Sequence, residues 1–503
     1  MAASSGSEKP NLLLLVLDCV RAWDFPGGVS AVGPMPFTER LLRDSVYFPN
    51  AASVAHWTVP SHASMFTGLY PWEHGVHAKG LLKLAESPEG LGPLLRGAGY
   101  TTLSISANGL ISPDLGLVHG MDRSAWGVSL FNRIGVADEP PQGSETEAHR
   151  LATAENTLRK RLASISYWTA YGLARAPAMW DFATRLAMRV RHPSFGARPR
   201  LAHWVEPTAA RWIREAPREQ PVYCFVNLLD AHEPYLAEPD VVRTLRAWWS
   251  YARTRQDRLG WVSGDWKPTE PELVLLHELY RTMVRSLDQR IESIVRAFQD
   301  SGRWENTTMI LTGDHGQAFG EHDAMFHIVG VDEPELRVPL YVRYPDRRDA
   351  GKVAQSWASL IDVYPTLLRE AGIVPPERPS RPIPLQDLLE SPRTEPVFAM
   401  SDGLVHDADR QRTATARREA IDRLLVAGYD GEFTVIHDPV RGDLRAFHAH
   451  DDPAEAHDLW STKGPELAPL AEGVRDIGRR ILAGPASEVP TDVEDRLRSW
   501  GYI

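Results

Sequence analysis

Short apolar runs alternate with helical patterns over the first three quarters of the chain. We interpret five runs as buried parallel strands, because each is a short, continuous apolar stretch; they cover residues 11–18, 101–108, 222–230, 307–314 and 340–345. Apolar residues recur at three-to-four spacing, as is typical of helices, in residues 38–45, 62–69, 90–99, 209–216, 287–302 and 360–372. The alternation predicts an α/β fold with a doubly wound, mostly parallel sheet flanked by helices.

Two stretches interrupt this alternation. Residues from about 124 to 205 are rich in Arg and Trp and show helical patterns, as do residues from about 240 to 282. We interpret both as helical inserts, and the first as an amphipathic lid over one end of the sheet. Because basic residues flank aromatic ones there, a helix on a membrane surface is the alternative.

The pattern changes again near residue 395, where short strands and turns replace the longer elements. Residues 423–448 predict hairpins with turns at 429–432 and 440–443, and a helix is expected over 466–484. We therefore predict a large α/β domain over residues 1–394 and a smaller C-terminal α+β subdomain over residues 395–503.

Composition narrows the classes of function. The chain has 503 residues and a formal net charge of −11, and nucleic-acid binders are typically basic, so nucleic acid is not the expected partner. The two cysteines, Cys19 and Cys224, imply no disulfide framework, and we expect both to be buried as small apolar residues. The N-terminal segment lacks the pattern of a secretory signal, and no apolar stretch is long enough for a transmembrane helix. We therefore expect a cytoplasmic protein without a transmembrane segment.

Acidic residues and histidines follow three of the predicted strands. Asp18 follows the first strand, Asp230 and His232 follow another, and Asp314 and His315 follow a third. In an open α/β sheet, ligands bind beyond the carboxyl ends of the strands. A lone Asp at a strand end is more often a turn residue. The three strand ends together favour a site for a divalent cation, because carboxylates and imidazoles are common ligands of such ions.

Thr58 lies where a loop turns into a helix, with Pro60 early in that helix. Taken alone, Thr58 would be an ordinary helix cap. The start of a helix also presents backbone N–H groups and the positive end of the helix dipole, which suit a phosphate or sulfate group. A coordinated divalent cation would lower the pKa of the Thr58 hydroxyl and make it a competent nucleophile.

With these residues in view, the chain resembles the sulfatase branch of the alkaline phosphatase superfamily. The resemblance is carried by "PNLLLLVLDCVRAWD", "TVPSHASMFTGLYPWEHGV", "NLLDAHEPY", "TTMILTGDHGQAFGEH" with "MFH", "LRVPLYVRYP", "SLIDVYPTLLREAGI" and "FHAHDDPAEAHDL". It covers nearly the whole chain outside the two inserts.

The resemblance implies a role for each matching residue. Asp18, Thr58, Asp314 and His315 would hold one divalent cation (Zn, Mn, Ca or Mg), with Thr58 also the attacking group. His232 and His327 would contact the transferred group or its leaving oxygen, and His327 could act as general acid. The alternative for His327 is a satisfied polar residue in a loop. Asp230, His232 and His327 form a possible second cation site, as in the phosphodiesterase branch.

The departures from the family pattern concern the nucleophile and the anion pocket. Sulfatases of this family oxidise a cysteine or serine to formylglycine, whereas the branched carbon of Thr58 cannot form that aldehyde. His62 replaces the signature arginine and is a candidate contact to the substrate or its oxyanion. Asn108 lies where the family places basic residues, and it is a candidate oxyanion contact or a turn residue. Cys19 occupies the position of a second acidic ligand; as a ligand it would favour a softer metal such as zinc, but we expect that it does not ligate.

These departures favour a phosphate ester, mono- or diester, hydrolysed through a covalent Thr58 intermediate. Three alternatives stay open: a sulfuric ester hydrolase that uses unmodified threonine, a soluble phosphotransferase, and a family member that binds an anion without cleaving it. We expect a small anionic ester as the partner, and homo-oligomerisation is possible.

Overall fold

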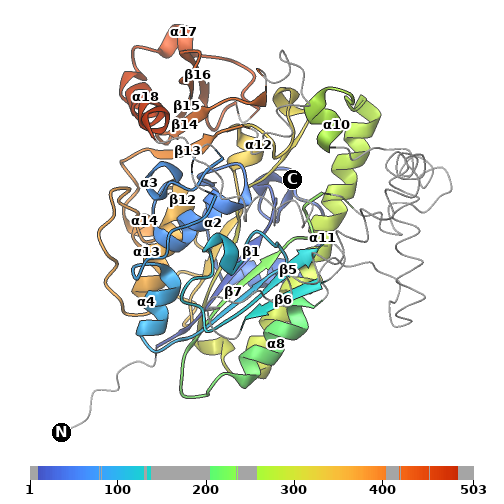
Figure 1. Ribbon diagram of the computed structural model, residues 1–503, viewed down its shortest axis with the longest axis vertical. Helices are drawn as coiled ribbons and strands as arrows, with labels where there is room; N and C mark the ends of the chain where they lie inside the picture. Colours follow the sequence, from blue (N-terminus) through green and yellow to red (C-terminus); the bar gives the residue numbers. More distant parts are fainter. Residues whose placement is uncertain are drawn as a thin grey trace, which may run out of the picture.

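The computed structural model describes the greater part of the chain (Figure 1). The described residues are 9–78, 80, 82–129, 133–137, 204–233, 235, 258–403, 419, 421–452 and 454–484. Most of the predicted insert at 124–205, and the part of the second insert before residue 258, lie outside these ranges. The prediction that the first insert forms a lid therefore stays a prediction.

A central eight-stranded sheet has the order β2-β11-β8-β1-β7-β4-β5-β6. Strands β8, β1, β7, β4 and β5 run parallel to one another, and β11 and β6 are antiparallel to their neighbours in that set. The strands span β1 Asn11–Leu17, β2 Val46–Tyr47, β4 Thr101–Ser106, β5 Arg123–Ser129, β6 Arg133–Ala137, β7 Val222–Leu228, β8 Thr307–Gly313 and β11 Leu340–Arg343.

Both faces of this sheet are buried, and β1 shows why its sequence is a continuous apolar run. Leu13, Leu15 and Leu17 belong to one core cluster, whereas Leu12, Leu14 and Val16 belong to another. Because side chains alternate across a strand, apolar residues at every position require a cover on each face. The first cluster contains side chains of α1 (Pro36–Arg43), α8 (Val205–Glu215) and α11 (Glu270–Asp300); the second contains those of α2 (Thr58–Thr67), α4 (Leu91–Gly97) and α13 (Val363–Glu370). Figure 1 shows the two groups of helices on opposite sides of the sheet.

A second sheet follows in the sequence. It has four antiparallel strands in the order β13-β14-β15-β16, spanning Val397–Ser401, Leu425–Tyr429, Phe433–Asp438 and Asp443–His448. Helix α18 (Ala468–Ala483) packs against it through apolar residues such as Leu470 and Val474. The predicted hairpin turns at 429–432 and 440–443 connect β14 to β15 and β15 to β16.

The fold class predicted from the sequence is confirmed, but three details are wrong. Strand β11, predicted to be parallel, is antiparallel to β8. The predicted helical insert at 124–205 begins instead with the strands β5 and β6 at the sheet edge. The predicted insert at 240–282 runs into the core helix α11, which continues without interruption to Asp300 and is preceded by the short helix α10 (Arg258–Ser263). No helix among the described residues is both long and apolar enough to cross a bilayer.

Candidate active site

Asp18 and Asp314 lie side by side at the carboxyl end of the sheet. Strands β1 and β8 are parallel neighbours with Leu17 opposite Gly313, so the next residue of each strand is one of the two aspartates. Both carboxylates are fully buried. Asp314 Oδ1 accepts hydrogen bonds from the backbone N–H of Cys19 (3.1 Å) and from its neighbour His315 (2.9 Å), whereas Asp314 Oδ2 has no hydrogen-bond partner. One buried carboxylate oxygen is therefore left for a ligand.

Thr58 is the first residue of α2, directly after the extended N-cap residue Trp57. The side-chain amide of Asn108 donates to Asp18 Oδ2 (2.9 Å) and to Thr58 Oγ1 (3.3 Å), so one amide joins the carboxylate and the hydroxyl. Thr58 Oγ1 also lies 3.5 Å from His315 Nε2. Since Nδ1 of His315 is 2.8 Å from the carbonyl oxygen of Gly316, Nδ1 donates to that carbonyl and Nε2 keeps its lone pair toward Thr58.

Burial and charge set the protonation of this group. Burial, and then the neighbouring Asp18 carboxylate, raise the pKa of Asp314 well above its usual value. Burial acts on Asp18 in the same direction, but His232, His315 and the Asn108 amide outweigh it and lower the Asp18 pKa. Burial lowers the pKa of His315, which favours the neutral imidazole that a metal ion requires. His315 Nε2 lies 3.4 Å from Asp314 Oδ2 and 3.5 Å from Thr58 Oγ1, and the Asn108 amide joins Thr58 to Asp18.

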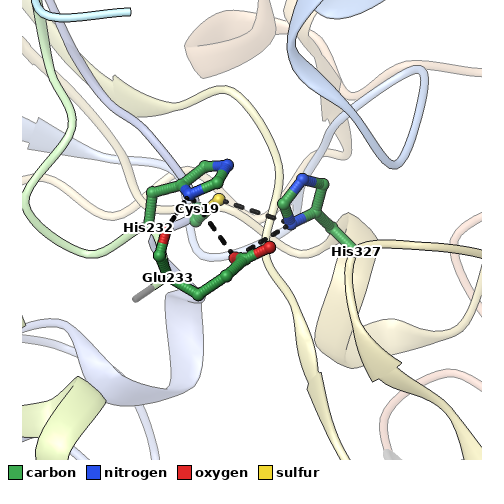
Figure 2. Close-up of side chains that lie close together, drawn as sticks. All are labelled: Cys19, His232, Glu233 and His327. Atoms are coloured by element: carbon green, nitrogen blue, oxygen red, sulfur yellow. Dashed lines mark hydrogen bonds and ion pairs between the residues drawn. The ribbon is translucent and has the colours of Figure 1, made fainter. Parts of the chain in front are cut away.

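A second cluster adjoins the first and contains Cys19, His232, Glu233 and His327, whose ligand atoms all lie within 4.8 Å of one another (Figure 2). His327 Nδ1 is 3.6 Å from Glu233 Oε2 and 3.8 Å from Cys19 Sγ. His232 Nδ1 is 2.6 Å from the Glu233 carbonyl oxygen. Both carboxylate oxygens of Glu233 are buried without a hydrogen-bond partner. Figure 2 shows the four side chains turned toward one another from three segments of the chain.

Asp230 does not belong to this second cluster, and the prediction that it forms a cation site with His232 and His327 is wrong. Arg290 of α11 donates to both oxygens of Asp230 at 2.7 Å and also pairs with Glu206 of α8 at 2.7 Å. The Asp230 carboxylate is thus held in a buried ion pair beneath the helices. Glu233, three residues further on, supplies the carboxylate that the sequence analysis assigned to Asp230.

His62 lies on the second turn of α2, behind Thr58. Its Nδ1 is 2.9 Å from the Thr58 carbonyl oxygen, and its ring makes edge contacts with Phe66 and Phe225. Burial lowers the pKa of His62 to about 4, so the ring is neutral at pH 7. The structure places His62 against the backbone of Thr58, and its contact with a substrate stays a prediction.

Two residues of the site were missed by the sequence analysis, and the role of a third stays a prediction. Glu233 was missed although it directly follows His232. Asn227, inside β7, donates to Asp18 Oδ2 over 3.3 Å, and nothing in an apolar strand pattern signals this contact. Cys19 and Cys224 are both buried as expected, and Cys19 lies between the two clusters, with its Sγ 3.3 Å from Asp18 Oδ1 and within reach of the second cluster.

Comparison with known proteins identifies the family of the chain. A family model described as Sulfatase matches residues 10–373. The multifunctional alkaline phosphatase superfamily protein PehA of Trinickia caryophylli is 24% identical over 389 residues, which cover 72% of this chain and 74% of that protein. Steryl-sulfatase of Mus musculus is 26% identical over 430 residues, which cover 74% of this chain and 63% of that protein.

Solved structures show the same fold. The phosphonate monoester hydrolase SpPMH from Silicibacter pomeroyi superimposes with a TM-score of 0.63 at 17% identity, covering 94% of this chain and 95% of that one. Enzymes of this family depend on a metal ion, and the clusters at Asp18 and at Glu233 supply candidate ligands. The chain therefore belongs to the sulfatase family of the alkaline phosphatase superfamily and is a hydrolase of ester bonds.

Proposed function

We propose that the protein hydrolyses a phosphate ester, mono- or diester, through a covalent intermediate on Thr58. The observation that carries this proposal is the position of Thr58 Oγ1, 3.3 Å from the Asn108 amide and 3.5 Å from His315 Nε2. A threonine at this position cannot form the aldehyde of formylglycine, so its own oxygen is the available nucleophile.

The residues around Thr58 fit a divalent cation. Asp314 Oδ2 is buried and accepts no hydrogen bond, although His315 Nε2 lies 3.4 Å from it. Two buried carboxylates next to each other need a positive charge or a proton between them. Asp18, Asp314, His315 and Thr58 would hold the ion. When bound, such an ion lowers the pKa of a hydroxyl and balances charge on the transferred phosphoryl group.

The chain's own residues then account for the steps at the phosphorus. The Thr58 hydroxyl gives up its proton to solvent, and its oxygen forms the bond to phosphorus while the ester oxygen departs. Asn108 fixes the position of the Thr58 oxygen, and the first backbone N–H groups of α2 face the phosphoryl oxygens. Water then attacks phosphorus and breaks the bond to Thr58, which returns the hydroxyl.

The second cluster adjoins this reaction centre, and we propose that it serves the leaving oxygen. The His232 and His327 ring centroids are 4.9 Å apart, and those of His315 and His327 are also 4.9 Å apart, so His327 lies between the two groups. In a protein with one cation, His327 would donate the proton to the leaving oxygen. Alternatively, Cys19, His232, Glu233 and His327 would hold a second cation that stabilises the same oxygen.

A sulfuric ester hydrolase that uses unmodified threonine is the second candidate, and membership of the sulfatase family favours it. The two functions are distinguished by comparing the turnover rates of the sulfate ester and the phosphate ester of the same nitrophenol. We expect the purified protein, loaded with Zn²⁺ or Mn²⁺, to cleave the phosphate or phosphodiester faster than the sulfate. A cytoplasmic location, a soluble acceptor and homo-oligomerisation stay predictions.

The nucleophile is tested by two substitutions at one position. Thr58→Ala should abolish turnover while the bound metal remains, and Thr58→Ser should retain turnover because it keeps the hydroxyl. Rapid acid quenching of the wild type with labelled substrate should trap phosphate on the peptide that contains Thr58. Turnover in Thr58→Ala equal to that of the wild type would exclude this mechanism.

A further inference from the structure

A third group of potential ligands lies away from Thr58, where the segment after the second sheet meets the large domain. His322 is in the turn Glu321–Asp323, Asp332 is the N-cap of α12 (Glu333–Leu336), and Glu455 follows β16. One ligand atom of each lies within 4.8 Å of the others. His322 Nε2 and Glu455 Oε2 are 3.7 Å apart.

The carboxylates of this group are buried, and several of their oxygens accept no hydrogen bond from an N–H group. Glu455 is 4% exposed and Asp332 is 6% exposed. Both oxygens of Glu455 and Oδ1 of Asp332 lack a partner, as do both oxygens of the nearby Glu335, which is 1% exposed. A buried carboxylate normally has its lone pairs satisfied, because desolvation without compensation is costly. These oxygens therefore require a proton or a cation.

When the acidic side chains around this group are ionised, they outnumber the arginines that face them. Four acidic residues gather here, namely Asp332, Glu333, Glu335 and Glu455. Two arginines oppose them: Arg445 is 3.8 Å from Asp332, and Arg337 is 3.4 Å from Glu333. Glu321 adds a further negative charge near Glu335, but Arg21 pairs with it at 2.9 Å. Two negative charges thus remain without a counter-charge, which is the charge of one divalent cation.

We propose that His322, Asp332 and Glu455 form a binding site for a divalent cation that is separate from the catalytic centre. One imidazole and two carboxylates suit a borderline ion such as Zn²⁺ or Mn²⁺, with water completing the coordination. The His322 side chain is 24% exposed, so the ion and its water can enter from solvent at that edge.

This cation would join three segments, two of which lead directly to the catalytic centre. His322 is followed by β10 (Met325–Phe326) and then by His327. The carbonyl oxygen of Glu335 in α12 accepts a hydrogen bond of 2.7 Å from the backbone N–H of Gly316, next to His315. Glu455 belongs to the segment between β16 and α18. The ion would thus fix the C-terminal segment against the chain that positions both histidines.

The test counts ions on the full-length protein. The protein is stripped with a chelator, loaded with Mn²⁺ or Zn²⁺, freed of excess ion by gel filtration and analysed for bound metal. We expect Glu455→Gln and His322→Ala each to bind one ion per chain fewer than the wild type. Asp451→Asn, an exposed acid of the same segment, is the control and should bind as many ions as the wild type. Crystals soaked in Mn²⁺ should show an anomalous peak among His322, Asp332 and Glu455.

Melting temperatures separate the cation from a proton shared between the carboxyl groups. Mn²⁺ should raise the melting temperature of the wild type several degrees more than that of Glu455→Gln. Equal ion counts in the wild type, Glu455→Gln and His322→Ala would overturn the proposal. The proposal would also be overturned if Glu455→Gln melted at a higher temperature than the wild type and if this difference were the same in chelator as in Mn²⁺.

Because Thr58 has no part in this site, Thr58→Ala should lose turnover and keep the ion at His322, Asp332 and Glu455. Failure of the proposed hydrolysis is therefore distinguishable from failure of this inference.

Discussion

The side-chain amide of Asn108 donates a hydrogen bond to Asp18 Oδ2 over 2.9 Å, although strands β4 and β1, which end just before the two residues, are not neighbours. Strand β7 lies between them, and its Asn227 donates to the same oxygen over 3.3 Å. Two amides from two strands therefore fix one oxygen of a buried carboxylate. Asn108 extends this arrangement to Thr58 Oγ1 and so couples the orientation of the Thr58 hydroxyl to that of the carboxylate.

Asn108→Ala should lower kcat by about 10²–10³-fold, which is typical for the loss of one donor that stabilises charge in the transition state. The variant should still bind metal, because Asp18, Asp314 and His315 remain. Steady-state kinetics with metal analysis of the same samples would check this. Asn306→Ala is the matched control, since Asn306 precedes β8 at the opposite end of the sheet. Loss of metal together with activity would instead assign Asn108 a role in holding the ion.

Arg290→Ala should destabilise the fold by about 3–5 kcal/mol, because it leaves the carboxylates of Asp230 and Glu206 buried and unpaired. Arg296→Ala on the same helix is the control. Its pair with Glu292 is exposed to solvent and contributes at most about 0.5 kcal/mol. Urea unfolding would measure both. Asp230→Asn should keep the full metal content; a loss of one ion per chain would return Asp230 to the metal ligands.

The burial of the neutral His74 ring predicts that the folded state loses stability in acid. Burial lowers its pKa to about 3, while Val76 N–H donates to Nδ1 and Ser64 Oγ lies 3.0 Å from Nε2. The folded state therefore favours the neutral ring. The contribution to stability is complete above the unfolded pKa of about 6.5 and is lost as the pH falls below it, by up to about 1.4 kcal/mol per pH unit.

Between pH 7.5 and pH 5, the free energy of unfolding should fall less in His74→Gln than in the wild type, by about 2 kcal/mol. His457→Gln is the control, because its side chain is 84% exposed and should leave the pH dependence unchanged. Urea unfolding at a series of pH values is the measurement. Parallel curves for the wild type and His74→Gln would show that the ring does not govern acid sensitivity.

The sequence was sufficient to predict the central sheet and the pairing of Asp18 with Asp314. Continuous apolar runs specify strands buried on both faces, and parallel strands bring their carboxyl ends to one edge, so the residues after β1 and β8 had to meet. The direction of β11 was not predictable in the same way. A short strand such as β11, with three apolar residues followed by Arg343, has the same pattern whether it is parallel or antiparallel to its neighbour.

The second cluster was predicted only in part, because the direction of a side chain after a strand depends on distant partners. Asp230 is withdrawn from the site by Arg290, which lies sixty residues further along the chain. No local pattern distinguishes an arginine on a core helix that pairs with Asp230 from one that faces solvent. Glu233 faces the site in its place, and only the three-dimensional path of the loop after β7 decides between the two carboxylates.

Cys19 provides the sharpest test of the second cluster. Burial, followed by the charges of Asp18, Asp314 and Glu233, raises the pKa of its thiol well above the usual value, so without a cation the thiol stays protonated. A bound cation would favour the thiolate, which is a soft ligand that prefers Zn²⁺ over Mg²⁺ or Mn²⁺. Cys19→Ser should therefore weaken Zn²⁺ binding at least about tenfold and change Mn²⁺ binding little.

Both affinities are measured by titrating the metal-free protein with each ion and recording turnover and metal content. Cys224→Ala is the control, since Cys224 is buried inside β7 away from the cluster. An unchanged ratio of the two affinities in Cys19→Ser would mean that sulfur is not a ligand, and the second cluster would then act through His327 as a proton donor.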